Sequence, residues 1–254
     1  MGGGSTMPRF FIDGGAPCGS LITVTGEDAR HITLSLRAKQ GERFTLCGEN
    51  AKEYLCRLEY ADKDSATLLV ESIRDSDAEP SIKVTLYQAL IKSDKFETVV
   101  QKSVELGVYE IVPVLTDRCV SKPDSGAKNK LLRWNKIAKE AAMQSGRARI
   151  PEVKEIISFD EAICQMKNAD LSFMCYENEK TLSVSQLFDK SYEKSEPKTF
   201  AFIIGPEAGF SEKEANAANL ASIPSVSLGP RILRAETAPL CVLSAIMFRS
   251  GNLG

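Results

Sequence analysis

Hydrophobic and polar positions alternate in short runs over the first third of the chain. The clearest runs are LITVT at residues 21–25 and ATLLV at residues 66–70, and both are rich in β-branched residues, as half-buried strands are. Turn-forming residues separate these runs, and one short helix is expected over residues 28–38. The pattern predicts a small β-barrel over residues 7–75.

A different pattern begins after residues 76–80, a polar segment that ends in proline and has the composition of a linker. Through residues 81–254, apolar runs alternate with amphipathic runs of helical period. The expected strands cover residues 82–91, 109–115, 171–177, 199–205 and 226–229, and the expected helices cover residues 93–107, 128–146, 211–222 and 238–251. This alternation indicates an α/β domain with a mainly parallel sheet and helices on both faces.

Composition narrows the class of protein. The chain has 254 residues, of which 43% are hydrophobic and 26% charged, as is usual for a globular protein. No apolar run reaches the roughly 18 residues of a membrane span, and no secretory signal is expected. Residues 1–6, MGGGST, have the composition of an expression leader, so we take Met7 as the native start. The 7 cysteines show no CxxC spacing, which favours reduced thiols in a cytoplasmic protein.

Charge and histidine content bear on the partners. A chain with one histidine and no cysteine cluster is not expected to hold a metal. The net charge of −2 does not point to nucleic acid, but basic residues strongly outnumber acidic ones over residues 118–149. This basic stretch is either a polyanion-binding surface or the solvated face of a lysine-rich helix.

Two loops with Gly-Pro near their start carry the candidate chemistry. They are IGPEAGFS at residues 204–211 and LGPRILRAETAP at residues 228–239, and each follows a predicted strand. Loops at the carboxyl ends of parallel strands bind ligands in open α/β sheets. Ser211 and Glu214 form a capping box, and Thr237 is expected to cap the last helix. Because neither loop matches a dinucleotide or polyphosphate motif, we expect a two-walled pocket for another ligand, with ordinary turns as the alternative.

These motifs resemble those of the 16S ribosomal RNA uridine-N3 methyltransferases, the RsmE-type branch of the SPOUT superfamily. The two loops are similar to that family's IGPEGGFS and LGxRILRxETA sequences. The likeness also covers residues 91–120 and 133–153, PRFF at residues 8–11 and HITLSLRAKQGE at residues 31–42. The chain departs from the family at four positions, which are Leu34, Ser35, Ala208 and Ala235.

The resemblance implies a fold and an activity. The fold would be a PUA-like β-barrel for RNA binding over residues 7–75, a linker over residues 76–80 and a SPOUT domain with a deep trefoil knot over residues 81–254. The activity would be S-adenosylmethionine-dependent methylation of N3 of a uridine, by convention position 1498, in 16S rRNA of the small ribosomal subunit. The family acts as a homodimer in the cytoplasm, and neither a metal nor a membrane is implied.

The resemblance and the basic stretch together imply the site residues. The residues expected in catalysis are Arg9, Arg234 and Glu236. The residues expected to hold S-adenosylmethionine are Tyr176, Glu177, Gly205, Pro206, Glu207, Gly209, Leu228, Gly229, Ile232, Leu233, Thr237 and Ala238. The residues expected to contact RNA are Arg9, Arg37, Arg118, Arg133 and Arg147.

The implied reaction requires the loss of a proton from uridine N3 and the stabilisation of the negative charge that this leaves on the base. Uridine N3–H is a weak acid with a pKa of about 10, similar to that of tyrosine, so its proton must leave before or during methylation. Arg234 or Arg9 would stabilise the negative charge that develops on the base. Glu207 or Glu236 could accept the proton, although Glu236 could instead form an ion pair with Arg231 or Arg234. Because N3 lies on the Watson–Crick edge, the target uridine must be unpaired.

Three other interpretations remain open from the sequence. A knotted methyltransferase could act on another RNA site, such as a ribose hydroxyl or tRNA, although the PRFF and ILRAETA motifs favour uridine N3. A ribosome-assembly factor could keep the fold and bind RNA without catalysis, but both Gly-Pro loops are intact. A small-molecule α/β enzyme would have no need of the basic stretch or the barrel.

Overall fold

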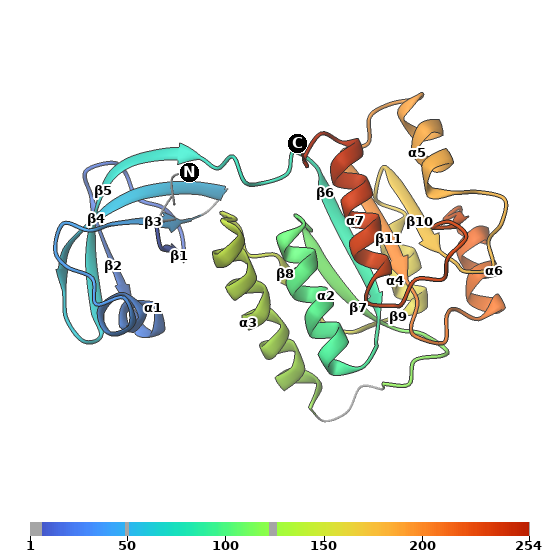
Figure 1. Cartoon of the computed structure of the whole chain (residues 1–254), viewed down its shortest axis with the longest axis horizontal. Helices are drawn as coiled ribbons and strands as arrows, with labels where there is room; N and C mark the ends of the chain where they lie inside the picture. The colour runs from blue at the N-terminus through green and yellow to red at the C-terminus, as the bar shows by residue number, and fades with distance from the viewer. Residues whose placement is uncertain (1–6, 49–50, 122–125, 254) are drawn as a thin grey trace. The chain divides into compact units, whose positions relative to one another are not determined.

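The chain forms two compact units. The computed structural model describes residues 7–48, 51–121 and 126–253 (Figure 1). The first unit is Met1–Glu79 with Ala142–Ile150, and the second is Pro80–Ala141 with Pro151–Gly254. The residues expected to be a leader, 1–6, lie outside the described residues.

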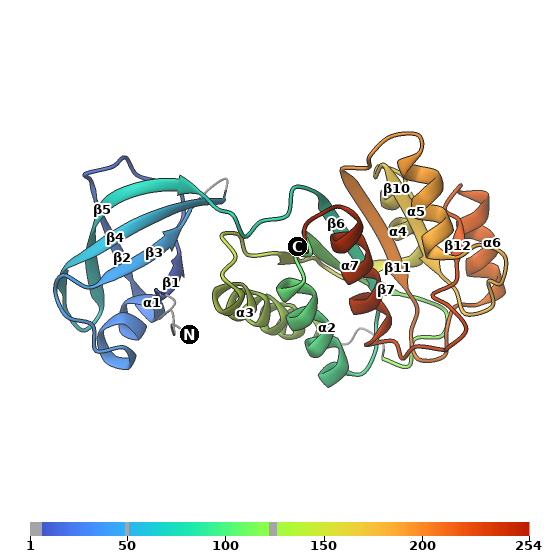
Figure 2. The ribbon, with the colours of Figure 1, turned by 45° about the horizontal axis from the view of Figure 1, so that its top comes forward.

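A five-stranded sheet with the order β1-β3-β4-β5-β2 forms the first unit. Its strands are β1 (Arg9–Phe11), β2 (Leu21–Thr25), β3 (Arg43–Cys47), β4 (Lys52–Ala61) and β5 (Ser65–Asp75). β1 runs parallel to β3, and all other neighbours are antiparallel. Within the described ranges no pairing joins β1 to β2, so the sheet is a half-barrel and not a closed barrel (Figure 2).

The core of the first unit follows the alternation in the sequence. Alternate residues of β5 are buried, and Leu68 lies with Phe10 and Phe44 in the apolar core. Met143 also packs against this core, which explains why residues 142–150 belong to the first unit. The expected helix starts and ends earlier than residues 28–38: α1 (Gly26–Arg30) continues into a π-helix, His31–Ser35.

A parallel sheet with the order β12-β10-β11-β6-β7-β8 forms the second unit, and β9 also pairs with β7. Its strands are β6 (Lys83–Ala89), β7 (Glu110–Leu115), β8 (Glu152–Val153), β9 (Ile157–Ser158), β10 (Leu171–Cys175), β11 (Thr199–Ile204) and β12 (Ser225–Val226). All the pairings are parallel, as the strand–helix alternation predicted. The carboxyl ends of β10, β11 and β12 therefore lie at the same edge of the sheet.

Helices cover both faces of this sheet. They are α2 (Ser93–Glu105), α3 (Ala127–Ser145), α4 (Phe159–Met166), α5 (Val184–Tyr192), α6 (Glu212–Leu220) and α7 (Ala238–Arg249). α4 and α6 bury apolar side chains against one face of the sheet. α2 and α7 contact each other, and α7 packs on β6 from the other face (Figure 1). None of the helices in the described ranges is long and apolar enough to cross a membrane.

Candidate active site

One pocket of about 560 Å³ lies at the carboxyl ends of β10, β11 and β12, entirely within the second unit. This volume lies within the range typical of small-molecule sites. The lining comes from α2, from the last residues of β10 and β11, from the loops after β10, β11 and β12, and from the first residue of α7. The lining residues are Lys95, Cys175, Tyr176, Glu177, Ile204, Gly205, Pro206, Glu207, Ala208, Gly209, Ser227, Leu228, Gly229, Pro230, Arg231, Ile232, Leu233, Arg234, Ala235, Glu236 and Ala238. The two Gly-Pro loops thus form walls of one pocket, as the sequence predicted.

The loop after β11 is shaped by Gly209. Its N–H donates to the carbonyl of Pro206 at 2.9 Å, which closes a tight turn, and its φ is +68°. A Cβ at this position would overlap the carboxylate of Glu177. Arg118 donates to the carbonyl of Ala208 at 3.2 Å and steadies the same loop from outside. The loop and Glu177 therefore approach each other as closely as they do only because residue 209 has no side chain.

The loop after β12 presents a cation to the pocket. Arg234 is exposed and lines the pocket, and its guanidinium has no hydrogen-bond or ion-pair partner in the part of the chain that the structure describes. The backbone N–H of Thr237 donates to the carbonyl of Arg234 at 2.9 Å, which fixes the turn before α7. Thr237 stands at the N-cap position of α7 but makes no capping bond with its side chain among the described residues. The side-chain cap predicted for Thr237 is therefore wrong. Thr237 also does not line the pocket, although the resemblance implied a contact with the ligand there.

Glu236 has a partner that the sequence did not suggest. Lys95 from α2 donates to its carboxylate at 3.2 Å, whereas the expected partners were Arg231 and Arg234. Burial alone would raise the pKa of Glu236, but a hydrogen bond from its own backbone N–H, the bond from Lys95 and the charge of Arg234 lower it. The lowered pKa makes Glu236 a weak base. Lys95 lies within the stretch that resembles the family, and that is the one sequence signal that could have identified it.

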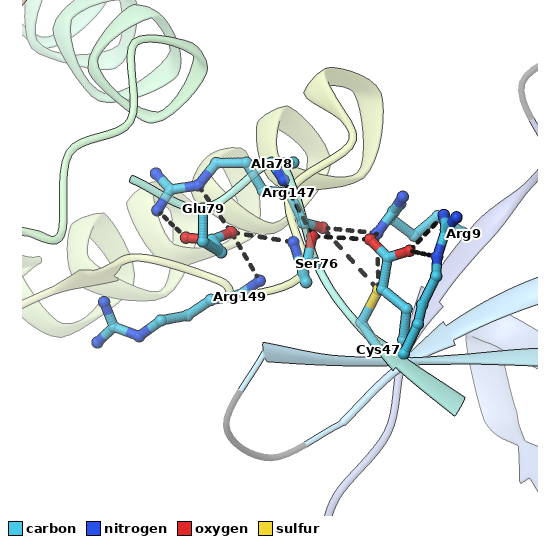
Figure 3. Close-up of polar contacts among 10 residues, drawn as sticks. Arg9, Cys47, Ser76, Ala78, Glu79, Arg147 and Arg149 are labelled. Carbon is cyan, nitrogen blue, oxygen red and sulfur yellow. Dashed lines mark hydrogen bonds and ion pairs between the residues drawn. The ribbon is translucent and has the colours of Figure 1, made fainter. Parts of the chain in front are cut away.

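Arg9 is part of a polar network in the first unit (Figure 3). It donates to Glu53 at 2.7 Å and to the Cys47 sulfur at 3.2 Å, and Glu53 also accepts a bond from Arg74 at 2.9 Å. Burial alone would lower the pKa of Arg9, but the hydrogen bonds to Glu53 and Cys47 and the charges of these two groups together raise it. The side chain of Arg9 is only 15% exposed. This cation is therefore held in place before any substrate binds.

Arg147 does not fit its predicted contact with RNA. The residue is 3% exposed, and its guanidinium donates to both carboxylate oxygens of Glu79, at 3.2 and 2.7 Å (Figure 3). Because its charge is buried and paired, Arg147 has a structural role in the first unit, and the prediction of a phosphate contact is corrected.

The other predicted RNA contacts are at the surface. Arg133 is 68% exposed and pairs with Glu97 at 2.7 Å, and Arg37 is exposed with a positive φ of 52°. Arg118 holds the loop at Ala208. Over the described ranges, no group of three or more histidine, cysteine, aspartate or glutamate side chains could hold a metal ion.

Known proteins match both units. A family model described as an RNA methyltransferase domain matches residues 78–247, and one described as an RNA methyltransferase PUA domain matches residues 24–71. Ribosomal RNA small subunit methyltransferase E of Bacillus subtilis is 36% identical over 232 residues, which cover 90% of each chain. The enzyme of the same name from Mesomycoplasma hyopneumoniae is 32% identical over 238 residues, covering 94% of this chain and 98% of its own.

A solved structure carries the same name. The crystal structure of a ribosomal RNA small subunit methyltransferase E from Neisseria gonorrhoeae, bound to S-adenosyl methionine, aligns with a TM-score of 0.86 at 32% identity. The alignment covers 95% of this chain and 97% of that one. A parallel α/β sheet with a three-loop pocket, together with a PUA domain, is the architecture of an RNA methyltransferase. This chain belongs to the family of ribosomal RNA small subunit methyltransferases E.

Proposed function

We propose that this protein transfers a methyl group from S-adenosylmethionine to N3 of a uridine in 16S rRNA of the small ribosomal subunit. The observation that carries the proposal is the single pocket into which both family-like loops bring their residues. Relatives that share at least 30% of the sequence over nearly the whole chain bear the name of this enzyme class. The solved relative from Neisseria gonorrhoeae binds the proposed donor.

The residues of the pocket fit this donor. Leu228, Ile232 and Leu233 offer apolar surface for an adenine ring, and the carboxylates of Glu177 and Glu207 suit a positively charged ligand. When bound, the donor supplies a methyl group that its sulfonium already activates, so the protein mainly has to position the two reactants. The residues proposed to hold it are Tyr176, Glu177, Gly205, Pro206, Glu207, Gly209, Leu228, Gly229, Ile232, Leu233 and Ala238.

Arg234 is the proposed catalytic cation of the second unit. Its guanidinium has no hydrogen-bond or ion-pair partner among the described residues. It lines the pocket and can stabilise negative charge on the pyrimidine as N3 loses its proton. Arg9 stays a candidate for the same work, because its pairing with Glu53 holds it in one orientation. Arg37, Arg118 and Arg133 remain the proposed contacts for RNA phosphates.

Assembly and location belong to the same proposal. We propose a homodimer in the cytoplasm, with the deep trefoil knot of the family in the second unit. Light scattering on the purified protein tests the first point, since a dimer has about twice the mass of the 27.8 kDa chain.

The activity has a direct test. The protein is incubated with labelled S-adenosylmethionine and small ribosomal subunits from a methylation-deficient strain, and the labelled nucleoside is mapped. We expect 3-methyluridine at one position of 16S rRNA. A different nucleoside, or a labelled ribose, would contradict the proposed site. Donor binding by calorimetry without any transfer would favour a non-catalytic assembly factor.

A further inference from the structure

Among the residues that the structure describes, six charged side chains line the pocket, and their charges balance. The cations are Lys95, Arg231 and Arg234, and the carboxylates are Glu177, Glu207 and Glu236. Cys175 and Tyr176 also line it. Because the total charge is close to zero, the chemistry of the pocket depends on where each charge lies.

The start of α2 lies where two walls of the pocket meet. The backbone N–H of Lys92 donates to Glu207 at 3.3 Å, and the ammonium of Lys95 donates to Glu236 at 3.2 Å. Glu207 belongs to the loop after β11 and Glu236 to the loop before α7. Lys95 is 26% exposed and is therefore a fixed part of the wall, unlike a freely moving surface lysine.

Glu236 is a poor acceptor for the uridine proton. Burial would raise the pKa of Glu236, but the hydrogen bond from its own backbone N–H, the bond from Lys95 and the charges of Lys95 and Arg234 lower it below its ordinary value of 4.5. Relative to free uridine, whose N3–H has a pKa of about 10, Glu236 is a weak base, and its carboxylate is already engaged by the ammonium of Lys95. The pairing therefore leaves Glu236 with a different role, which is to orient the ammonium of Lys95.

We propose that Lys95, oriented by Glu236, acts with Arg234 to stabilise the deprotonated uridine, and that solvent hydroxide removes the N3 proton. This inference rests on the proposed function and states which groups take part in the removal of the uridine N3 proton. The N3–H bond breaks, its electron pair stays on N3, and the proton joins hydroxide to give water. Lys95 touches the substrate base in this scheme, whereas Glu236 is a positioning residue.

The physical reason is electrostatic. A cation within about 4–6 Å of an acid favours its charged form and lowers the pKa by about 1–3 units. Lys95 lies in the first turn of α2, a helix of 13 residues, whose positive end adds to the same field. Two cations and a helix start can therefore bring a usable fraction of the uridine into its anionic form near neutral pH.

The test is the pH profile of single-turnover methylation of small ribosomal subunits, from about pH 6 to about pH 9. The wild-type rate is expected to rise about tenfold per pH unit until the bound uridine ionises. Lys95→Met removes the charge, so the rate near pH 7 should fall about 10- to 100-fold, and the deficit should shrink as the pH rises. Lys95→Arg keeps the charge and should recover most of the rate.

Lys102→Met is the matched control. Lys102 lies on the same helix and pairs with Glu105 at 2.8 Å, but it does not line the pocket. Its profile should coincide with that of the wild type. Glu236→Gln should keep the rise with pH and lose less rate than Lys95→Met, because it removes only the partner that orients the lysine.

Two kinetic outcomes would overturn the inference while leaving the proposed function in place. One is a Lys95→Met profile that runs parallel to the wild-type profile at every pH. The other is a Glu236→Gln enzyme that loses the rise with pH and about 100-fold or more in rate, since that result assigns the proton to Glu236.

Calorimetry with S-adenosylmethionine supplies a readout that is independent of turnover. Lys95→Met should bind the donor with a Kd within about threefold of the wild type, because Lys95 acts on the base. A loss of donor affinity above about tenfold would assign Lys95 to the donor pocket and overturn the inference. Wild-type protein that binds the donor but never methylates uridine N3 would instead refute the proposed function, and the inference with it.

Discussion

Gly209 has a positive φ of 68°, and a side chain there would overlap the carboxylate of Glu177. Both constraints act at one residue, on a loop that forms a wall of the pocket. Ala208 beside it departs from the sequence typical of the family, but it is exposed and its carbonyl is held by Arg118. The two neighbouring positions therefore differ sharply in what they tolerate.

Gly209→Ala is expected to weaken donor binding by about tenfold or more, because the added methyl displaces Glu177 and strains the backbone by about 1–2 kcal/mol. Calorimetric titration with S-adenosylmethionine measures the loss. Ala208→Gly is the control and should change the Kd by less than about twofold. Equal affinities for Gly209→Ala and the wild type would show that the close approach to Glu177 has no part in donor binding.

The ionised carboxylate of Glu53 contributes to the folding stability of the first unit. It is 3% exposed and accepts bonds from Arg9, Arg74 and Ser76. Burial would raise the pKa of Glu53, but these three bonds lower it below 4.5. Its stabilising effect is therefore fully present above about pH 4.5 and is lost as the pH falls through the lower pKa of the folded state.

Glu53→Gln should destabilise the protein by about 3 kcal/mol at neutral pH, because Arg9 loses its buried partner. The difference from the wild type should narrow as the pH falls below about 4.5. Glu71→Gln is the matched control: Glu71 pairs with Arg43 and Arg57 but is 24% exposed, and a loss of about 1 kcal/mol or less is expected. Urea unfolding at several pH values measures both, and a pH-independent difference for Glu53→Gln would contradict the linkage.

At the scale of elements, two helix ends show what a glycine contributes. Gly107 follows α2 with a φ of +91°, and Gly146 follows α3 with a φ of +80°. A Cβ at Gly107 would lie 2.7 Å from Pro80 Cγ and 3.2 Å from Met247 Cε, whereas a Cβ at Gly146 would meet nothing within 4 Å. A side chain at Gly146 would cost only backbone strain, whereas a side chain at Gly107 would cost backbone strain and a steric clash. Comparing the two positions therefore separates these two contributions to the free energy of unfolding.

Gly146→Ala should cost about 1 kcal/mol, the strain of a left-handed alanine, and Gly107→Ala about 2 kcal/mol or more. The extra loss at Gly107 arises because Pro80 or Met247 must move. Urea unfolding of the two variants measures the difference. Equal losses would mean that α7 and the chain at Pro80 adjust without cost.

The sequence predicted most elements of the second unit but missed four short ones. Strands β8 and β9 contain two residues each, which is too short for any periodic signal. Helices α4 and α5 did carry a signal, because Ser158 and Ser183 each open a capping box that matches the S-x-x-E/Q pattern. The pairing of Lys95 with Glu236 could not be predicted, because 141 positions separate the two residues and only the packing of α2 beside the loop brings them together.

At the scale of the whole molecule, the chain leaves the second unit after Ala141 and returns to it at Pro151. Linear patterning could not predict where the chain changes unit, because the helical period of α3 (Ala127–Ser145) crosses the boundary after Ala141 without a break. The contacts that hold the excursion belong to the first unit. Arg147 donates to Glu79, and Glu79 also accepts the backbone N–H groups of Ala148 and Arg149 at 3.0 and 3.2 Å (Figure 3).

Glu79→Gln should therefore release residues 142–150, because it removes the carboxylate charge that pairs with the buried guanidinium of Arg147, at a cost of about 3–5 kcal/mol. Hydrogen exchange measures the release, and the amides of Ala148 and Arg149 should exchange faster in the variant than in the wild type. Asp75→Asn, which removes an ion pair with Lys52 from a side chain that is 82% exposed, is the control and should leave exchange in this segment unchanged. Unaltered exchange in Glu79→Gln would show that other contacts, such as the packing of Met143 on the core, are enough to keep the segment in the first unit.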